Sequence, residues 1–390
     1  MLSTLSSVLP KLPVAIPQDV ILLSPYGWTL FALIFALVLA GYALPGEKQS
    51  SSDSRKKVVE ASSTMLVASW QVSTNTPPSP GHVSVSKILV HPIKSCRGIS
   101  VQTARFTPEG LENDRLWCII DAVKVNVVTA REIGKMVLIT PSIETDGTLK
   151  IAFPKESGCE ELSIPLRPTE DTLKTWDILP NIIMWPTHPA MDGYICESII
   201  GPKGTASVVL SKFIGRPVHL AFKGPQPRRI DPTTAVPDLV ATAKYQDMYP
   251  LLVLSEESTG AIEKELRGHV GTQGIEERWK TDRIVIERFR PNIIFRGGGP
   301  FAEDNWREIQ IGTEGAPRIT LVSKCTRCLL PNVSPETGER DKAVPYKVLM
   351  KFRMGLESKH RMKACVGCNG VPSGDGIVRV GDPVYIRKMA

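Results

Sequence analysis

The sequence predicts a mainly β protein of the α+β class, with two β-barrel-like domains behind an N-terminal transmembrane helix. Short apolar or alternating runs, each bounded by turn residues, recur along most of the chain, and this density favours barrels or sandwiches over alternating βαβ units. A chain of 390 residues is long enough to bury more than one core. An uncharged segment near the N-terminus accounts for the predicted helix.

That uncharged segment spans residues 20–46 and is long enough to cross a bilayer as a helix. A cleaved signal peptide is the alternative, but the apolar run is longer than usual and no basic region adjoins it. Four basic residues follow the segment closely, whereas only Lys11 precedes it. This bias predicts that the body faces the cytosol. Residues 47–80 are rich in Ser, Thr, Pro and charge, which indicates a disordered linker.

The first folded domain is predicted at residues 81–225. Asp146-Gly147 is a strong hairpin signal between two of its strands. A helix is expected at residues 207–214, ended by Gly215. The predicted strands are residues 87–90, 116–120, 125–129, 136–143 and 148–153.

The second domain is predicted at residues 230–388. Ser255 is placed to cap a helix at 256–268, and a second helix is expected at 346–353. The predicted strands are residues 251–254, 283–287, 292–295, 308–311, 319–322, 377–380 and 383–386. No nucleotide-binding glycine motif is present in the sequence. The net charge of +7 is diffuse, which argues against nucleic-acid binding.

The candidate chemistry lies at Cys325-Thr-Arg-Cys328, directly after an apolar strand pattern. A thiolate is a soft metal ligand, and the cation of Arg327 would lower a neighbouring thiol pKa. Cys365 and Cys368 form a second C-x-x-C, so a four-thiolate zinc site is the alternative, although the interval between the pairs is long. The eight cysteines show no disulfide framework, which suits a reducing compartment.

Basic residues elsewhere would form an anion site if the fold gathers them. Lys94 lies in a loop after a strand, and Arg115 and Arg290 lie beside other strands. Each could equally be an ordinary surface cation or an ion-pair partner. Together with Arg327 they would suit phosphate or pterin acceptors, because a guanidinium group can donate two parallel hydrogen bonds to one such acceptor group.

Several motifs occur together in a specific order, and the set resembles the MOSC-domain family with its N-terminal β-barrel partner, in particular its mitochondrial amidoxime-reducing branch. The motifs include His-Pro-Ile-Lys-Ser-Cys-Arg-Gly, Arg-Phe-Arg-Pro-Asn and Cys-Thr-Arg-Cys. The resemblance covers residues 82–388. The motifs lie at residues 90–98, 110–117, 129–132, 288–292, 325–328, 335–338 and 380–384.

The resemblance implies a molybdenum cofactor (Mo-molybdopterin) between the two domains, with Cys328 as both metal ligand and catalytic residue. It implies reduction of N-hydroxylated compounds, with electrons from NADH-cytochrome b5 reductase through cytochrome b5, at the mitochondrial outer membrane. The rival from another class is a zinc-stabilised sulfur-carrier or binding module without turnover. The resemblance implies cofactor contacts from Lys94, Ser95, Arg115, Asp247, Tyr249, Arg290, Asn292 and Arg327.

The sequence departs from that pattern in three places. The N-terminal anchor and linker are longer than the family pattern. Residues 268–282 look like an inserted loop, and the second C-x-x-C has no ligand role in the family pattern. No pyridoxal-phosphate lysine motif or aminotransferase-like domain is visible, so the resemblance to a cofactor sulfurase is limited to its C-terminal module.

Overall fold

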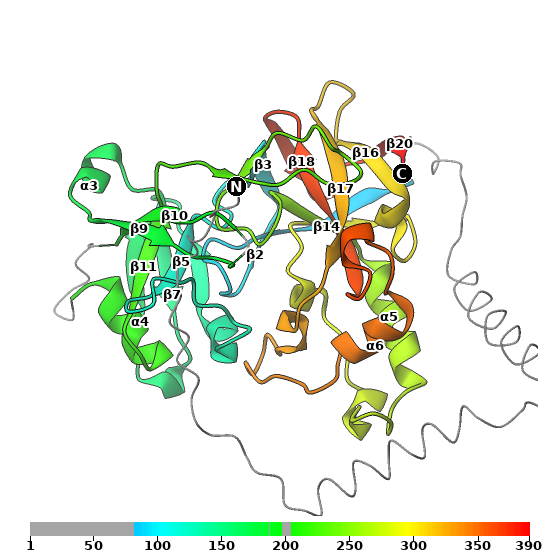
Figure 1. The fold of residues 1–390 in the computed structure, drawn as a ribbon, viewed down its shortest axis with the longest axis horizontal. Coiled ribbons are helices and arrows are strands. Elements are labelled where there is room, and N and C mark those ends of the chain that lie inside the picture. The colour runs from blue at the N-terminus through cyan, green and yellow to red at the C-terminus, as the bar shows by residue number, and fades with distance from the viewer. Residues whose placement is uncertain (1–81, 187, 197–203) are drawn as a thin grey trace, which may run out of the picture. The chain divides into compact units, whose positions relative to one another are not determined.

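The computed structural model describes residues 82–186, 188–196 and 204–390, all of which belong to one compact unit, residues 73–390 (Figure 1). The predicted anchor at 20–46 and linker at 47–80 lie outside the described residues. Within the described ranges, no helix is both long and apolar enough to cross a membrane.

The described part of the chain is mostly β, and its largest element is a curled eight-stranded sheet. All neighbouring strands in it are antiparallel except β14 and β15, which are parallel. The Val85 N–H donates to the Asp382 carbonyl (2.9 Å), so the start of β1 bonds the segment just before β20. In order, the strands are β2 (Ile99–Val101), β1 (Ser84–Val90), β15 (Ile293–Arg296), β14 (Leu251–Ser255), β18 (Cys365–Pro372), β17 (Arg318–Thr326), β16 (Trp306–Ile311) and β20 (Val384–Met389).

The curled sheet joins the two predicted domains, because β1 from the first pairs with β15 from the second. Its concave side encloses an apolar core that includes Phe106, Phe295 and Trp306. Gly376 allows this packing, since a Cβ there would lie 2.3 Å from the Phe106 ring. The strands that carry the site motifs are therefore fixed to one another by backbone hydrogen bonds.

A second core forms around Trp117, which is fully buried and donates its indole N–H to the Leu166 carbonyl (3.1 Å). Helix α4 packs on β11 over this core, as the sequence predicts, and ends at Gly215 with φ of 88°. Four smaller sheets complete the described β structure. Their strands are β5 (Trp117–Asp121), β11 (Val218–Lys223), β10 (Met191–Ile195) and β9 (Ile178–Ile182); β6 (Thr140–Ile143), β7 (Thr148–Ala152) and β8 (Leu162–Pro165); β19 (Gly376–Arg379), β3 (Thr103–Thr107) and β4 (Gly110–Leu111); and β12 (Arg228–Arg229) and β13 (Thr242–Ala243).

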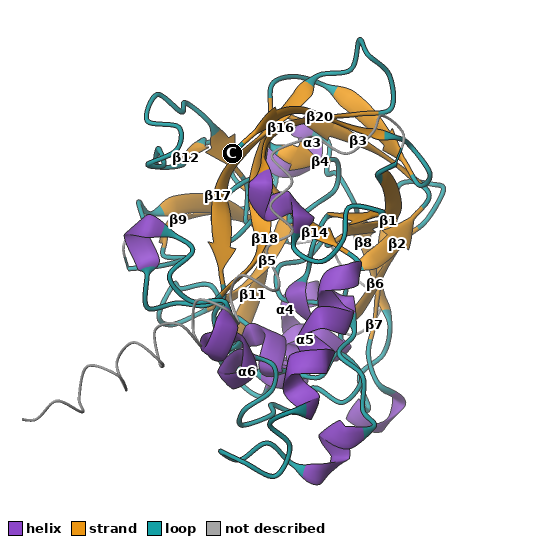
Figure 2. Cartoon of the chain, turned by 90° about the vertical axis from the view of Figure 1, so that its right-hand side faces the viewer, coloured by secondary structure: helices purple, strands orange, loops and turns teal. Residues whose placement is uncertain are grey.

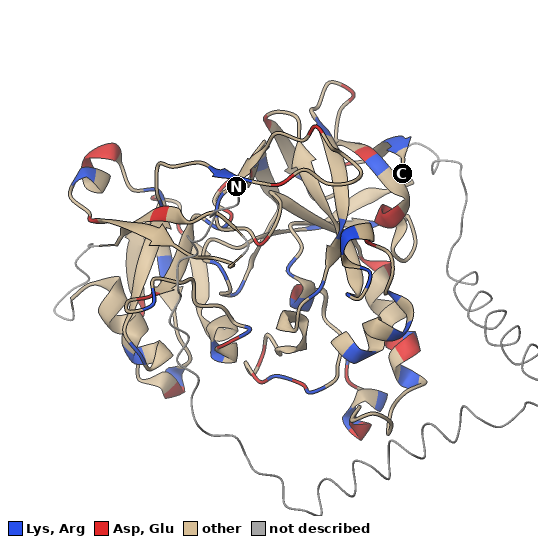
Figure 3. Cartoon of the chain, in the orientation of Figure 1, with Lys and Arg blue, Asp and Glu red and all other residues tan. Residues whose placement is uncertain are grey.

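Helices are short in the part that the structure describes, and α5 and α6 lie together beside the curled sheet (Figure 2). Acidic and basic residues are interspersed along the chain (Figure 3), in line with the diffuse net charge. The α-helices are α3 (Glu170–Lys174), α4 (Ala206–Ile214), α5 (Glu257–Arg267) and α6 (Tyr346–Phe352). The 3-10 helices are η1 (Gly134–Leu138), η2 (Lys155–Ser157), η4 (Glu277–Lys280), η5 (Ile286–Phe289), η6 (Ala302–Asn305), η7 (Leu330–Asn332) and η8 (Ser358–His360).

Four local predictions were wrong. Residues 125–129 form only isolated bridges, and the predicted strand at 136–143 begins as η1. The apolar run at 283–287 leads into η5 instead of a strand. Ser255 does not cap α5, because it ends β14 and its hydroxyl bonds the buried Glu303 carboxylate.

Candidate anion and thiol site

One pocket, here called the thiol pocket, brings together every site residue predicted from the sequence. These residues come from the loop after β1, the segments before β5, β14 and β15, and the end of β17. They are far apart in sequence, and the pairing of these strands places them side by side. The predicted residues that line the thiol pocket are Lys94, Ser95, Arg115, Asp247, Tyr249, Arg290, Asn292, Arg327 and Cys328.

Three residues of the thiol pocket hold the left-handed backbone conformation, which side chains other than glycine rarely adopt. Their φ angles are 68° at Ser95, 50° at Arg115 and 56° at Arg290. Such a conformation costs about 1–3 kcal/mol at each residue and persists only where surrounding structure enforces it. Strain of this kind gathers at binding and catalytic sites. The three angles mark this pocket independently of any sequence motif.

Lys94 is the buried cation at one end of the pocket. Its ammonium donates to the Tyr245 carbonyl (2.8 Å) and pairs with Asp247, whose side chain is more than half exposed. Burial lowers the Lys94 pKa, while Asp247 raises it in part, and the net shift is downward. Partial desolvation of the Asp247 carboxylate beside the buried Lys94 opposes its ionisation, but the Lys94 ammonium and the nearby guanidinium groups outweigh this effect and lower the Asp247 pKa. An anion arriving here would compete with Asp247 for Lys94.

Arg115 is held by a fully buried carboxylate, Asp114. The Arg115 Nη1 to Asp114 Oδ2 distance is 2.5 Å, and the His91 backbone N–H donates to Oδ1 (2.8 Å). Burial alone would raise the Asp114 pKa, yet Arg115 and the His91 contacts lower it to about 2. Burial, aided by the Arg115 and Arg290 charges, lowers the His91 pKa well below its usual value, so the imidazole is neutral at pH 7.

Arg290 and Arg327 carry N–H groups that find no partner in the described structure. Arg290 Nη1 donates to the Cys96 carbonyl (2.6 Å), but its buried Nη2 is unpaired. Arg327 Nη2 donates to the Phe289 carbonyl (2.8 Å), but its buried Nε is unpaired. No described carboxylate lies within ion-pair distance of either guanidinium. Burial lowers the Arg290 pKa to about 10. These unmet donors fit an anionic ligand.

Cys328 follows the end of β17 and is half-buried at the pocket wall. The Leu330 N–H donates to its Sγ (3.4 Å). Arg327 Nη1 instead reaches Cys325 Sγ (3.1 Å). Burial raises the pKa of Cys325 and outweighs the Arg327 guanidinium, which acts to lower it as the sequence indicated.

Cys365 and Cys368 lie within β18, a buried strand absent from the sequence prediction. Cys368 Sγ contacts the Glu303 carbonyl (3.3 Å), and burial raises its pKa well above the usual value. Burial likewise raises the pKa of Cys365 to about 12. Across the described ranges, no three His, Cys, Asp or Glu side chains are grouped so that they could hold a metal ion. The two C-x-x-C pairs therefore do not form the four-thiolate zinc site.

Two predicted contacts have structural partners of their own. The Asn292 side chain accepts the Leu252 N–H (3.1 Å) and donates to the Leu89 carbonyl (3.3 Å), so it ties β14 to β1. Tyr249 donates its hydroxyl to the Asp231 carbonyl (3.1 Å). Both still line the thiol pocket, where they shape its wall.

Sequence reasoning missed several neighbours of the pocket. Trp185 places its ring 5.5 Å from the Lys94 ammonium and 4.1 Å from the Arg131 guanidinium, and its indole N–H donates to the Asp247 carbonyl (3.3 Å). Trp185 belongs to no recognisable sequence motif, so its position beside Lys94 could not be predicted from the sequence. Two further lining residues are Gln246 and Asn369.

Comparisons with known proteins agree with this arrangement. Residues 82–183 match the model of the MOSC N-terminal beta barrel domain, and residues 241–385 match that of the MOSC domain. The mitochondrial amidoxime-reducing component 1 of Mus musculus is 31% identical over 320 residues, which cover 78% of this chain and 82% of that protein. The chain belongs to the MOSC-domain family.

Further proteins are similar at lower identity. The Homo sapiens mitochondrial amidoxime-reducing component 1 is 28% identical over 317 residues, covering 78% of this chain and 82% of the relative. Among solved structures, the YUAD protein from Bacillus subtilis covers 77% of this chain and 93% of its own, with 10% identity. Its TM-score of 0.32 is too low to support an inference.

Proposed function

We propose that this MOSC protein is a molybdenum-cofactor oxidoreductase that reduces N-hydroxylated compounds to the parent N–H compounds. The observation that carries the proposal is the composition of the thiol pocket. The half-buried thiol of Cys328 lines it together with four cationic side chains, those of Lys94, Arg115, Arg290 and Arg327. The relatives named amidoxime-reducing components support the same class of reaction.

The residues present fit a pterin cofactor with a phosphate group. Lys94, Arg115 and Arg290 supply positive charge, and the unpaired N–H groups of Arg290 and Arg327 would bind phosphate or pterin acceptors. The strained Ser95 backbone holds the β1 loop against this wall. A polyanion of the cofactor's charge would satisfy donors that otherwise remain buried and unpaired.

Cys328 would hold the metal through its Sγ, because a thiolate is the ligand that suits a soft metal. The Leu330 N–H would stabilise negative charge on that sulfur. When bound, the cofactor would supply two electrons and accept the oxygen removed from the substrate. Arg327, anchored on the Phe289 carbonyl, would keep the group beside Cys328 from shifting.

We extend the proposal to the partners and the location. Electrons would come from NADH-cytochrome b5 reductase through cytochrome b5, and the names of the relatives support a mitochondrial location. The uncharged segment at 20–46 supports attachment to a membrane with the body in the cytosol. The choice of the mitochondrial outer membrane rests on the resemblance to the amidoxime-reducing branch. Reconstitution with the two donor proteins in liposomes would measure whether NADH oxidation depends on this chain.

The direct test replaces Cys328 by Ser in protein made in a host with an intact cofactor pathway. We expect benzamidoxime reduction with an artificial electron donor to fall to background, because a hydroxyl is a poor ligand for a soft metal. Cys159→Ser serves as the matched control, since Cys159 is also half-buried but does not line the thiol pocket. Parent-level activity of the Cys328→Ser protein would contradict the assignment.

A further inference from the structure

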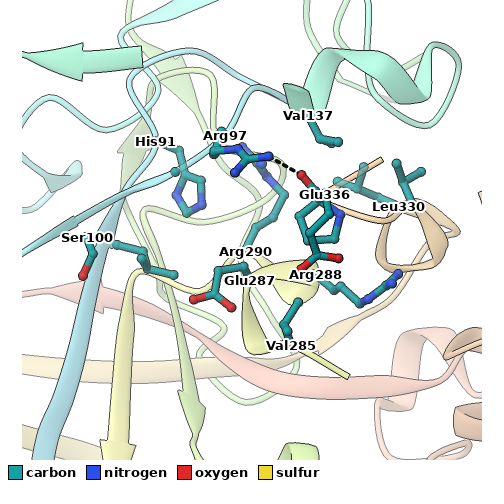
Figure 4. A pocket seen from close by; sticks show the side chains of 14 residues that line it. His91, Arg97, Ser100, Val137, Val285, Glu287, Arg288, Arg290, Leu330 and Glu336 are labelled. Atoms are coloured by element: carbon teal, nitrogen blue, oxygen red, sulfur yellow. Dashed lines mark hydrogen bonds between the residues drawn. The ribbon is translucent and has the colours of Figure 1, made fainter. Parts of the chain in front are cut away.

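A second pocket, here called the arginine pocket, adjoins the thiol pocket and shares Arg290 and Leu330 with it (Figure 4). Its cavity of about 300 Å³ reaches the lower end of the range for small-molecule sites. Three arginines line it, namely Arg97, Arg288 and Arg290. Its apolar wall consists of Leu89, Val137, Val285, Leu330, Val333 and Pro335.

The three arginines have donors without partners in the described part of the chain. The Nε atoms of Arg97 and Arg288 and the Nη2 atom of Arg290 are buried and unpaired. Arg288 itself is only 7% exposed. The remaining bonds are to backbone carbonyls: Arg97 donates to Pro335, and Arg288 donates to Pro331 (3.1 Å). These bonds hold the guanidinium groups in place without neutralising their charge.

The carboxylates at this pocket are engaged elsewhere or lie in solvent. Glu287 pairs with Lys87 at 2.7 Å, and Glu336 is exposed. No described carboxylate comes within 4.0 Å of a nitrogen of the three arginines. Arg288 is buried, and Arg97 and Arg290 are half-buried. Three guanidinium groups gathered here without a carboxylate in ion-pair contact repel one another, and an anion bound between them would lower that cost.

His91 adds shape to the pocket instead of charge. Burial and the neighbouring arginines lower its pKa, so the ring is neutral at pH 7. Gly98 lies flat against this ring, because a Cβ there would be 2.7 Å from Nε2. The ring and the apolar wall leave room for a flat, uncharged body beside the guanidinium groups.

We propose that the arginine pocket binds a small organic carboxylate with an apolar body, at a site separate from the thiol pocket. The carboxylate would accept from Arg97, Arg288 and Arg290, and the body would lie against Val137, Val285 and Leu330. The inference goes beyond the proposed function, since two of its three cations, Arg97 and Arg288, lie outside the thiol pocket and only Arg290 is shared with it. Because Arg290 lines both pockets, occupancy of one site would be sensed at the other.

Titration calorimetry on the full-length chain tests the proposal, with benzoate as the probe. We expect saturable binding of benzoate that is at least tenfold tighter than that of benzamide, its neutral counterpart. Acetate should bind more weakly than benzoate, because it lacks the apolar body. Equal binding of benzamide, or tighter binding of inorganic phosphate than of benzoate, would overturn the assigned ligand class.

Variants identify the site. Loss of one charged hydrogen bond should weaken benzoate binding about tenfold in Arg97→Met and in Arg288→Met. Arg361→Met is the control, because this arginine is exposed and lies outside the pocket. Arg97 is only half-buried, so its variant remains informative if Arg288→Met does not fold. Unchanged binding in folded Arg97→Met would refute the site.

A comparison of cofactor-free with cofactor-loaded chain separates the two pockets. We expect both preparations to bind one benzoate per chain, with an affinity that shifts through Arg290. Complete loss of benzoate binding on cofactor loading would show that the arginine pocket is part of the cofactor site, and would overturn the proposal.

Discussion

Replacing Arg115 by Met tests the electrostatic account of the thiol pocket. Arg115 is the closest cation to Asp114, a carboxylate with no exposed surface, and it lowers the Asp114 pKa to about 2. The difference from the usual value of 3.8 corresponds to about 2.5 kcal/mol of stability at neutral pH. Removing one partner of a buried ion pair typically costs about 3–5 kcal/mol, because the other charge stays buried.

The assay is urea unfolding at pH 7 of protein made without the cofactor pathway, so that ligand binding does not contribute to stability. We expect Arg115→Met to lose about 3–5 kcal/mol and the double variant Asp114→Asn, Arg115→Met to recover roughly half of that loss. Arg105→Met is the matched control, since its guanidinium is 57% exposed and lies 3.7 Å from Glu112. Its pair should contribute less than about 1 kcal/mol.

The pH dependence gives an independent check with a defined sign. A carboxyl whose pKa is lowered by folding stabilises the protein above its unfolded pKa, near 3.8. That stability is lost as the pH falls toward 2, where Asp114 takes up a proton. Asp114→Asn should therefore flatten the loss of stability between pH 4 and 2. A double variant no more stable than Arg115→Met, with an unaltered acid profile, would refute the reasoning.

Two further predictions concern a thiol pair and a turn. The double variant Cys365→Ala, Cys368→Ala should keep about one molybdenum per chain by elemental analysis, because both thiols lie in β18 and no described metal-binding cluster includes them. Loss of molybdenum from a folded double variant would show that Cys365 or Cys368 is a metal ligand. Gly110→Ala should lower the free energy of unfolding by more than about 2 kcal/mol, since its φ is 101° and a Cβ would lie 2.4 Å from the Pro250 carbonyl oxygen. Gly147→Ala is the control for backbone strain alone, because Gly147 has φ of 85° and a Cβ there would meet no atom within 4 Å. An equal loss of unfolding free energy in both variants would exclude the clash with the Pro250 carbonyl as the cause.

The site residues could be predicted because short motifs carry them. Cys-Thr-Arg-Cys follows an apolar run, and the structure places it at the end of β17 as that pattern indicates. What the sequence could not show is the left-handed backbone at Arg115 and Arg290. Arginine has no intrinsic preference for that conformation, so only tertiary contacts, such as the Cys96 carbonyl that holds Arg290, select it.

The second C-x-x-C shows why spacing alone was misleading. In an extended strand, residues three apart point to opposite faces, so Cys365 and Cys368 could converge only if the chain turned between them. The run Cys-Val-Gly-Cys-Asn-Gly-Val-Pro contains glycines and proline, which are depleted in strands, so β18 was not expected. Gly367 resolves the conflict, because its φ of 79° and its approach to the Val253 carbonyl make room for strand pairing.

Arg290 links these observations into one electrostatic argument. Its backbone is in the left-handed conformation, its Nη1 donates to the Cys96 carbonyl in the loop after β1, and it lines both the thiol pocket and the arginine pocket. A buried cation in this setting, with Arg115 nearby and no described carboxylate in ion-pair contact, raises the free energy of the protein without ligand. An anion in either pocket relieves part of that cost. The second anion then gains less, so the two pockets should oppose each other's binding through this one residue.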